Sequence, residues 1–217
     1  MRSRRFAPVA LLLCRLVLGL LMLGLAIIPA GAADPAGHVT RIKGEASVAS
    51  GGDRRALAQG TAVFAGDTVT TGKDARLELS MVDGTKVTLG DDSELLIDDY
   101  VYSPRGKTGR GALTLAHGVF RAVTGALAKL AGEPFRVATP VASIGIRGTD
   151  FWGEQRADRL LIALLGGKAV VVENAAGRVT LARRNLATRV EGAGQAPTQP
   201  FALTADQLRA ALATVAW

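Results

Sequence analysis

The sequence predicts an all-β protein built from many short strands and completed by one C-terminal helix. Short runs with alternating apolar residues recur from Val39 to about Glu191, and glycine-rich turns separate them. Only residues 203–217 repeat apolar side chains at helical spacing. The 217 residues include 26 glycines and only 5% aromatic residues, which is typical of many tight turns. We expect the strands to stack as a sandwich or as a short irregular β-solenoid.

Residues 1–32 have the pattern of a secretory signal peptide. Four arginines and no acidic residue accompany an apolar run from Leu16 to Ile28, and small residues follow at positions 30–32. This run is shorter than the roughly 20 apolar residues that a membrane-spanning helix needs. We therefore expect cleavage after Ala32 or Ala33, a periplasmic or secreted location in a bacterium, and no stable membrane span afterwards.

The basic charge and the single cysteine belong mainly to this N-terminal segment. The whole chain has a net charge of +7 and a mean hydropathy of +0.25, but only +3 remains when residues 1–32 are removed. Cys14 follows Leu13 and precedes the apolar run, which is the wrong order for a lipoprotein signal. The exported chain would contain no cysteine, and this excludes disulfides, thiolate nucleophiles and cysteine-ligated zinc.

The clearest strand pair lies on either side of Asp83-Gly84. Arg76–Met81 and Lys86–Leu89 both alternate between apolar and polar residues, and an Asp-Gly pair between such runs predicts a β-hairpin with a type I′ turn. The same reasoning predicts further strands at Glu94–Val101, Ala112–Ala116, Phe135–Thr139, Leu160–Leu165, Ala169–Glu173 and Val179–Ala182.

A weak internal repeat places a glycine just before a short apolar-rich strand. It occurs at Gly44, Gly118 and Gly167, with spacings of 74 and 49 residues. Because these spacings are unequal, the repeat does not establish a regular solenoid.

The β domain is expected to span residues 33–191, with a linker at 192–202 and an amphipathic helix at 203–217. The linker is rich in glycine, proline and small residues. Thr204 and Gln207 have the spacing of a capping box at the start of the helix. We expect this helix to dock on the β domain, and the alternative is a helix that binds a partner.

Two short strings resemble catalytic motifs but fail the required spacing. Gly106–Thr108 ends like a phosphate-binding loop, but Val101 stands where that loop needs glycine, and a β-type run follows. Ser143 is followed by a glycine two residues later, but Val141 replaces the first glycine of a nucleophile elbow.

No metal or cofactor site is predicted, and the protein is not expected to be an enzyme. His38 and His117 are the two histidines, and neither has a second metal ligand at helical spacing. The acidic residues between Asp91 and Asp99 lack the spacing of an EF-hand, so a solvated strand edge is favoured over a calcium site.

A glycine-rich segment, Ser103–Gly111, carries three cations and is expected to join two strands as a mobile loop. Arg105, Lys107 and Arg110 make it a candidate contact for an acidic partner or an anionic glycan, and the alternative is an ordinary solvated loop. No aromatic residues are interleaved with these cations, so nucleic acid is not an expected partner.

Thr139, Arg147, Gly148 and Thr149 are predicted to shape a tight structural corner. Gly148 lets the backbone bend, Thr149 can cap the turn, and Arg147 can pair with a carboxylate. We therefore expect Arg147→Ala to lower the melting temperature.

Four strings together resemble the FecR domain. They are Phe64–Gly72, Ala75–Leu89, Leu115–Gly125 and Ala138–Asp150, within a region of resemblance from Val39 to Glu173. The family is known as the periplasmic part of a regulator that relays an iron-dicitrate signal from an outer-membrane transporter to a cytoplasmic sigma factor. The resemblance implies a β domain that binds rather than catalyses, and it supplies no catalytic residues.

The residues and the resemblance together favour a free-standing, exported FecR-like protein without catalytic activity. Such a protein would act by binding another envelope protein, in a role that includes signal sensing or regulation. The alternative is a structural module that binds the cell wall or another glycan. Neither function requires a cofactor.

Overall fold

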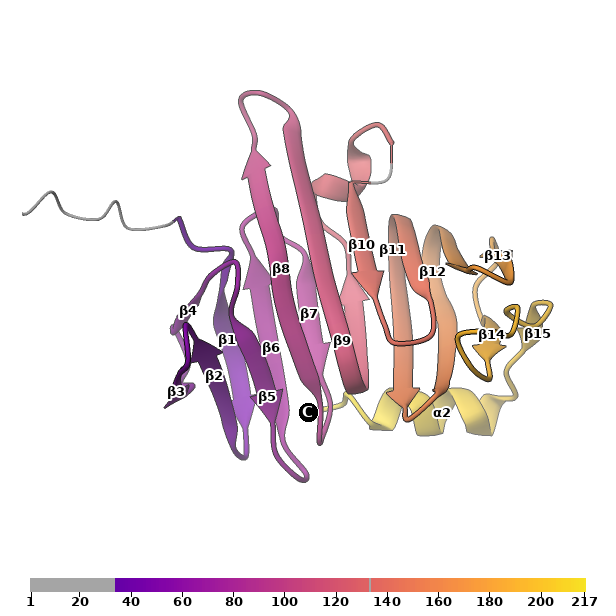
Figure 1. The fold of residues 1–217 in the computed structure, drawn as a ribbon, viewed down its shortest axis with the longest axis horizontal. Coiled ribbons are helices and arrows are strands. Elements are labelled where there is room, and N and C mark those ends of the chain that lie inside the picture. Colours follow the sequence, from indigo (N-terminus) through magenta and orange to yellow (C-terminus); the bar gives the residue numbers. More distant parts are fainter. Residues whose placement is uncertain (1–33, 133) are drawn as a thin grey trace, which may run out of the picture. The chain divides into compact units, whose positions relative to one another are not determined.

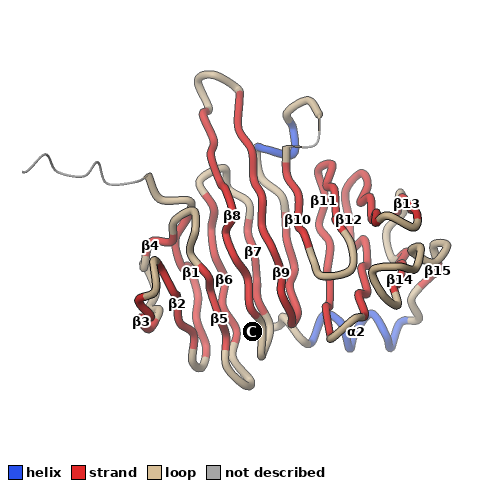
Figure 2. Tube along the Cα trace, in the orientation of Figure 1, coloured by secondary structure: helices blue, strands red, loops and turns tan. Residues whose placement is uncertain are grey.

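Strands make up most of the protein, as the sequence predicts. The structure is a computed structural model that describes residues 34–132 and 134–217, and the predicted signal peptide at 1–32 lies outside the described residues. Figure 2 shows that, among the described residues, helix is confined to a short 3-10 turn, η1 (Leu127–Lys129), and a C-terminal helix, α2 (Ala205–Ala213). The strands are β1 (Gly37–Lys43), β2 (Ala46–Ser50), β3 (Asp53–Ala56), β4 (Ala62–Val63), β5 (Thr68–Thr71), β6 (Arg76–Met81), β7 (Lys86–Leu89), β8 (Glu94–Ser103), β9 (Thr108–Val123), β10 (Phe135–Ala138), β11 (Ser143–Arg156), β12 (Arg159–Asn174), β13 (Gly177–Leu181), β14 (Leu186–Val190) and β15 (Phe201–Ala202).

All fifteen strands belong to one hydrogen-bonded sheet that folds over into two facing layers. The first layer has the order β3, β2, β5, β8, first half of β9, β10, first half of β11, second half of β12, β13. The second layer has the order β4, β1, β6, β7, second half of β9, second half of β11, first half of β12, β14, β15. Figure 1 shows β5 and β8 in front of β6 and β7. The all-β class with one C-terminal helix is confirmed.

The three longest strands, β9, β11 and β12, each run through both layers. They bend at glycines with positive φ, namely Gly118 (φ 101°), Gly148 (φ 64°) and Gly167 (φ 92°). Gly44 (φ 73°) lies in the turn between β1 of the second layer and β2 of the first. The predicted strands Leu160–Leu165 and Ala169–Glu173 are therefore the two halves of one bent strand, β12, because glycine bends the chain there without ending its hydrogen bonding.

One hydrophobic core fills the space between the two layers. Strict alternation along β6 buries Leu77, Leu79 and Met81, as the sequence pattern predicts. Phe120 of β9 and Phe151 of β11 meet edge to face in this core, with ring centroids 5.3 Å apart.

The hairpin predicted at Asp83-Gly84 forms between β6 and β7, but its turn type is a correction. Met81 N donates to Thr85 O (2.8 Å) and Gly84 N donates to Met81 O (2.9 Å), which gives a three-residue loop. Of the Asp-Gly pair, only Gly84 (φ 82°) has a positive φ, whereas a type I′ turn needs positive φ at both residues. A three-residue loop that ends in a glycine with positive φ is typical of a type I turn followed by a bulge.

Helix α2 covers the outer face of the second layer. Its capping box forms as predicted, with the Thr204 hydroxyl accepting from Gln207 N and the Gln207 side chain accepting from Thr204 N. A second apolar cluster joins the helix to the sheet through Ala211 and Val215 against Val119, Trp152, Ala163, Leu165 and Ala187. Among the described residues, no helix has the length and apolar character needed to cross a bilayer.

Candidate functional site

The buried carboxylate of Asp83 is the centre of the most connected polar network in the FecR-like strings. Oδ1 accepts from Thr85 N (3.0 Å) and from the Tyr100 hydroxyl (2.8 Å). Oδ2 accepts from the Thr85 hydroxyl (2.9 Å) and from Leu127 N (3.0 Å). All four donors are supplied by the protein, so this carboxylate holds the β6–β7 hairpin, β8 and η1 together. Its role is structural, and sequence reasoning recognised Asp83 only as a turn residue.

Burial, with the neighbouring Asp83 carboxylate, raises the pKa of Tyr100 well above its usual value. The phenol therefore stays protonated and donates to Asp83. The Asp-Gly-Thr string and the aromatic residue on β8 thus act as one structural unit.

The four predicted corner residues lie at two different places, one in a turn and three within strand β11. The Thr139 hydroxyl donates to Ala142 O (3.0 Å) and accepts from Ala142 N (3.1 Å), which closes the turn between β10 and β11. Gly148 and the buried Thr149 lie in the middle of β11, where the strand passes between layers, and Arg147 is exposed beside them. The structure brings Arg147, Gly148 and Thr149 together and leaves Thr139 elsewhere.

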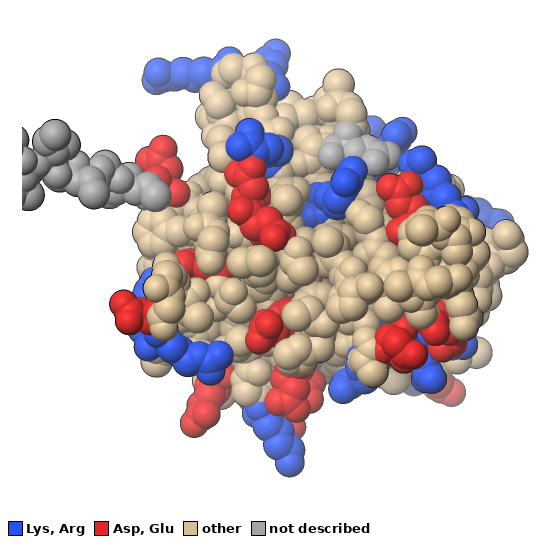
Figure 3. Space-filling model, in the orientation of Figure 1, with Lys and Arg blue, Asp and Glu red and all other residues tan. Residues whose placement is uncertain are grey.

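The predicted contact loop is the tip of a projecting hairpin. Pairing between β8 and β9 continues to Ser103 and Thr108, which leaves only the turn 104–107 between the strands. Arg105 and Lys107 are exposed on this turn. Figure 1 shows that the β8–β9 hairpin projects from the sheet, and Figure 3 shows Lys and Arg side chains at its projecting end. Arg110 lies on β9 and donates from Nε to the Asp99 carboxylate. Two of the three cations therefore lie at the tip, and the charge of the third, Arg110, is neutralised by Asp99 on β8.

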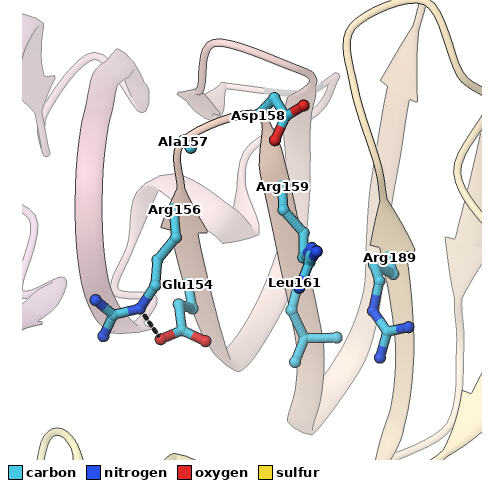
Figure 4. Close-up of a pocket in the computed structure, with 7 residues that line it drawn as sticks. All are labelled: Glu154, Arg156, Ala157, Asp158, Arg159, Leu161 and Arg189. Atoms are coloured by element: carbon cyan, nitrogen blue, oxygen red, sulfur yellow. Dashed lines mark hydrogen bonds and ion pairs between the residues drawn. The ribbon is translucent and has the colours of Figure 1, made fainter.

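A shallow pocket of about 390 Å³ lies beside the β11–β12 turn (Figure 4). Its three arginines are paired with carboxylates: Arg156 donates to Glu154 (2.6 Å), and Arg159 and Arg189 both approach Glu191 outside the lining (2.9 and 3.6 Å). The hydrogen bond to Glu154 is the main reason that the pKa of Arg156 is raised. The pocket is lined by Glu154, Arg156, Ala157, Asp158, Arg159, Leu161 and Arg189.

The residues with catalytic or metal-binding potential are dispersed. His38 lies on β1 in the second layer, whereas His117 lies on the part of β9 that belongs to the first layer. Within residues 34–132 and 134–217, no group of three or more His, Cys, Asp or Glu side chains could hold a metal ion.

Solved structures of similar fold come from Parabacteroides distasonis ATCC 8503. Two crystal structures, at 1.65 and 2.50 Å resolution, are described as candidate anti-sigma factors. They share 16% and 15% sequence identity with this chain, with TM-scores of 0.51 and 0.52. Each alignment covers 67% of this chain, and it covers 64% and 63% of the two structures, so this chain matches somewhat less than two thirds of their length. At this identity the likeness shows the fold alone.

No curated protein is significantly similar to this chain. The FecR family, described as "FecR protein", matches residues 67–170. The match includes the Asp83 network, the layer-crossing glycines 118, 148 and 167, and the projecting hairpin. Residues 67–170 therefore match the FecR family, as the sequence resemblance predicts.

Proposed function

We propose that the protein is a non-catalytic regulator that takes part in signal sensing by binding another protein of the bacterial cell envelope. The observation that carries the proposal is the FecR match over residues 67–170, the part of the chain that forms most of the folded sheet. Two structures of similar fold are described as candidate anti-sigma factors, which supports a regulatory role. The export signal expected at residues 1–32 supports an envelope location.

The proposed contact site is the β8–β9 tip with Arg105 and Lys107, next to Arg110 on β9, which is paired with Asp99. A hairpin whose strands pair up to the turn is a stiff support, so the tip can dock with little loss of conformational freedom. Arg105 and Lys107 are exposed, and neither takes part in an ion pair formed between described residues. An acidic surface on the partner would complement them and speed the encounter.

Crosslinking in intact cells tests the proposal. A photoreactive amino acid is placed at Lys107 in the full chain and, as a matched control, at Lys73, an exposed lysine in another turn. We expect one protein adduct that forms from position 107, is absent from position 73, and weakens when Arg105→Glu is added. Capture of peptidoglycan fragments alone would instead favour the glycan-binding alternative, and hydrolytic or transferase activity of the purified chain would contradict both.

A further inference from the structure

Three chain segments surround a hollow of about 380 Å³ that is separate from the hairpin tip. They are the chain from the end of β9 to η1, the middle of β11 and the middle of β12. The lining residues are Val123, Thr124, Gly125, Ala128, Lys129, Gly148, Thr149, Gly167 and Lys168. Five of these residues belong to strings that identify the family, but no local sequence pattern joins the three segments.

The walls of this hollow are fixed by backbone contacts. Thr149 N donates to the Thr124 hydroxyl (2.8 Å), and Thr124 N and its hydroxyl both donate to Thr149 O (3.0 Å each). A Cβ at Gly167 would lie 2.2 Å from Gly148 O, so β11 and β12 are in direct backbone contact there. The hollow is therefore formed before any ligand arrives, which lowers the entropic cost of binding.

Two lysines border the hollow. Lys129 and Lys168 are exposed and line it, and neither takes part in an ion pair formed between described residues. Asp150, which pairs across the strands with Val123, is held by Arg121 at 2.7 and 2.8 Å. The other nearby carboxylate, Asp83, already has four donors. The net charge presented to a ligand is positive.

A buried hydroxyl in the wall lacks a hydrogen-bond partner among the described residues. Thr149 is 4% exposed, and its Oγ1 makes no hydrogen bond, although its backbone N and O are both used. Buried hydroxyls are nearly always paired in folded proteins, so an unpaired one beside a positively charged hollow indicates an oxygen ligand.

We propose that this hollow binds a phosphate group. Lys129 and Lys168 would neutralise the phosphate dianion as two point charges, and the Thr149 hydroxyl would donate to one of its oxygens. At about 30 Å³ per water in the liquid, the hollow has room for roughly a dozen waters, so it can also hold part of the molecule that carries the phosphate. That carrier is a soluble phosphomonoester or a phospholipid headgroup.

Titration with inorganic phosphate, followed by NMR of the ¹⁵N-labelled protein, tests the site. We expect saturable shifts of the Gly148 and Gly167 amides, and about tenfold weaker binding in the Lys129→Gln/Lys168→Gln double variant. The matched control, Lys43→Gln/Lys73→Gln, removes two exposed lysines elsewhere and should bind phosphate as the wild type does. Shifts that do not saturate, or an equal loss in the control, would overturn the proposal.

A second variant separates a specific site from general charge attraction. Thr149→Val removes the hydroxyl but keeps the side-chain shape, and the dispersion of the amide spectrum reports whether the variant is folded. We expect a folded Thr149→Val protein to bind phosphate more weakly than wild type at unchanged net charge. Undiminished binding by that folded variant would remove the hydroxyl from the site and overturn its proposed geometry.

Vesicle sedimentation distinguishes the two sources of phosphate. Vesicles of phosphatidylcholine, with and without phosphatidic acid, are mixed with wild type and with the Lys129→Gln/Lys168→Gln variant. Sedimentation that needs both phosphatidic acid and the two lysines assigns the site to a lipid headgroup. Phosphate shifts in solution without sedimentation assign it to a soluble phosphomonoester. Neither effect depends on the partner of the hairpin tip, so failure of this proposal leaves the proposed function standing.

Discussion

At the residue scale, Asp83 joins three parts of the chain through one buried carboxylate. Its donors come from its own turn, from β8 and from η1, so the β6–β7 hairpin cannot move without breaking contacts to both neighbours. A buried charge is stable only when its hydrogen bonds are complete. Loss of a single acceptor should therefore lower the free energy of unfolding strongly.

Asp83→Asn is expected to lower the free energy of unfolding by roughly 2–4 kcal/mol. The amide keeps the shape of the carboxylate, but its NH2 group would face a donor where an acceptor is needed. Urea unfolding measures the loss, and Asp53→Asn on the exposed strand β3 is the matched control with the same charge change. A loss no larger than that of the control would show that the network is not stabilising.

Tyr100→Phe should destabilise the protein by about 1–3 kcal/mol at neutral pH, because Asp83 loses one of its donors. The difference from wild type should depend on pH. In the unfolded chain a tyrosine ionises near pH 10, whereas burial beside Asp83 keeps Tyr100 protonated in the folded state. The stabilisation by Tyr100 is therefore complete below about pH 10 and declines as the pH rises further. Urea unfolding of both proteins between pH 8 and 11 would reveal this convergence, and a constant difference across that range would contradict it.

The sequence predicts the turn at Asp83-Gly84 but not the network built on it. A hairpin signal is local, since alternation and the Asp-Gly pair lie within one short segment. The partners Tyr100 and Leu127 are 17 and 44 residues away, and only tertiary pairing brings them to the carboxylate. For the same reason the sequence does not predict that Lys129 and Lys168 line one hollow. They do so because three separate segments of the chain meet there.

At the scale of the element, glycines allow single strands to serve both layers. Gly44, Gly118 and Gly167, which the sequence marks as a weak repeat, all have positive φ and lie where the chain passes from one layer to the other. The repeat is irregular because the chain also passes between the layers at other points that lie between these glycines. Gly148 has the same role but precedes no apolar-rich run, so the pattern does not reveal it.

Gly118→Ala should be much more destabilising than Gly52→Ala, although the two glycines have nearly the same φ (101° and 100°). At both positions an alanine would have to adopt a left-handed backbone conformation, which lowers the free energy of unfolding by about 1–2 kcal/mol. Only at Gly118 would the new Cβ lie 2.3 Å from Ser93 Oγ and 2.4 Å from Ser93 Cα, whereas nothing lies within 4 Å at Gly52. Thermal unfolding compares the variants directly. Equal melting temperatures would mean that the crossing at Gly118 can relax away from Ser93.

At the scale of the whole molecule, two separate apolar clusters stabilise the fold. The larger cluster lies between the two layers and includes no residue of α2, whereas the smaller one lies between the second layer and the helix. The three bent strands belong to both layers, so the sheet is a single hydrogen-bonded unit without the helix. Helix α2 is therefore a cover over one face, and the sheet should fold in its absence.

Removal of residues 203–217 tests this division of the core. We expect the shortened chain to keep its β-sheet circular dichroism but to melt at a lower temperature, because Trp152 and its apolar neighbours lose the cover of Ala211 and Val215. The deletion also removes Trp217, so Trp152 becomes the one remaining tryptophan of the chain and a direct reporter. Its emission should shift to longer wavelength, since its indole loses both burial and the hydrogen bond to the Thr214 hydroxyl (3.0 Å). Thr204→Ala, which only weakens the helix cap by about 1 kcal/mol, should lower the melting temperature slightly and leave the emission unchanged. An unfolded shortened chain would show instead that α2 completes a single indivisible core.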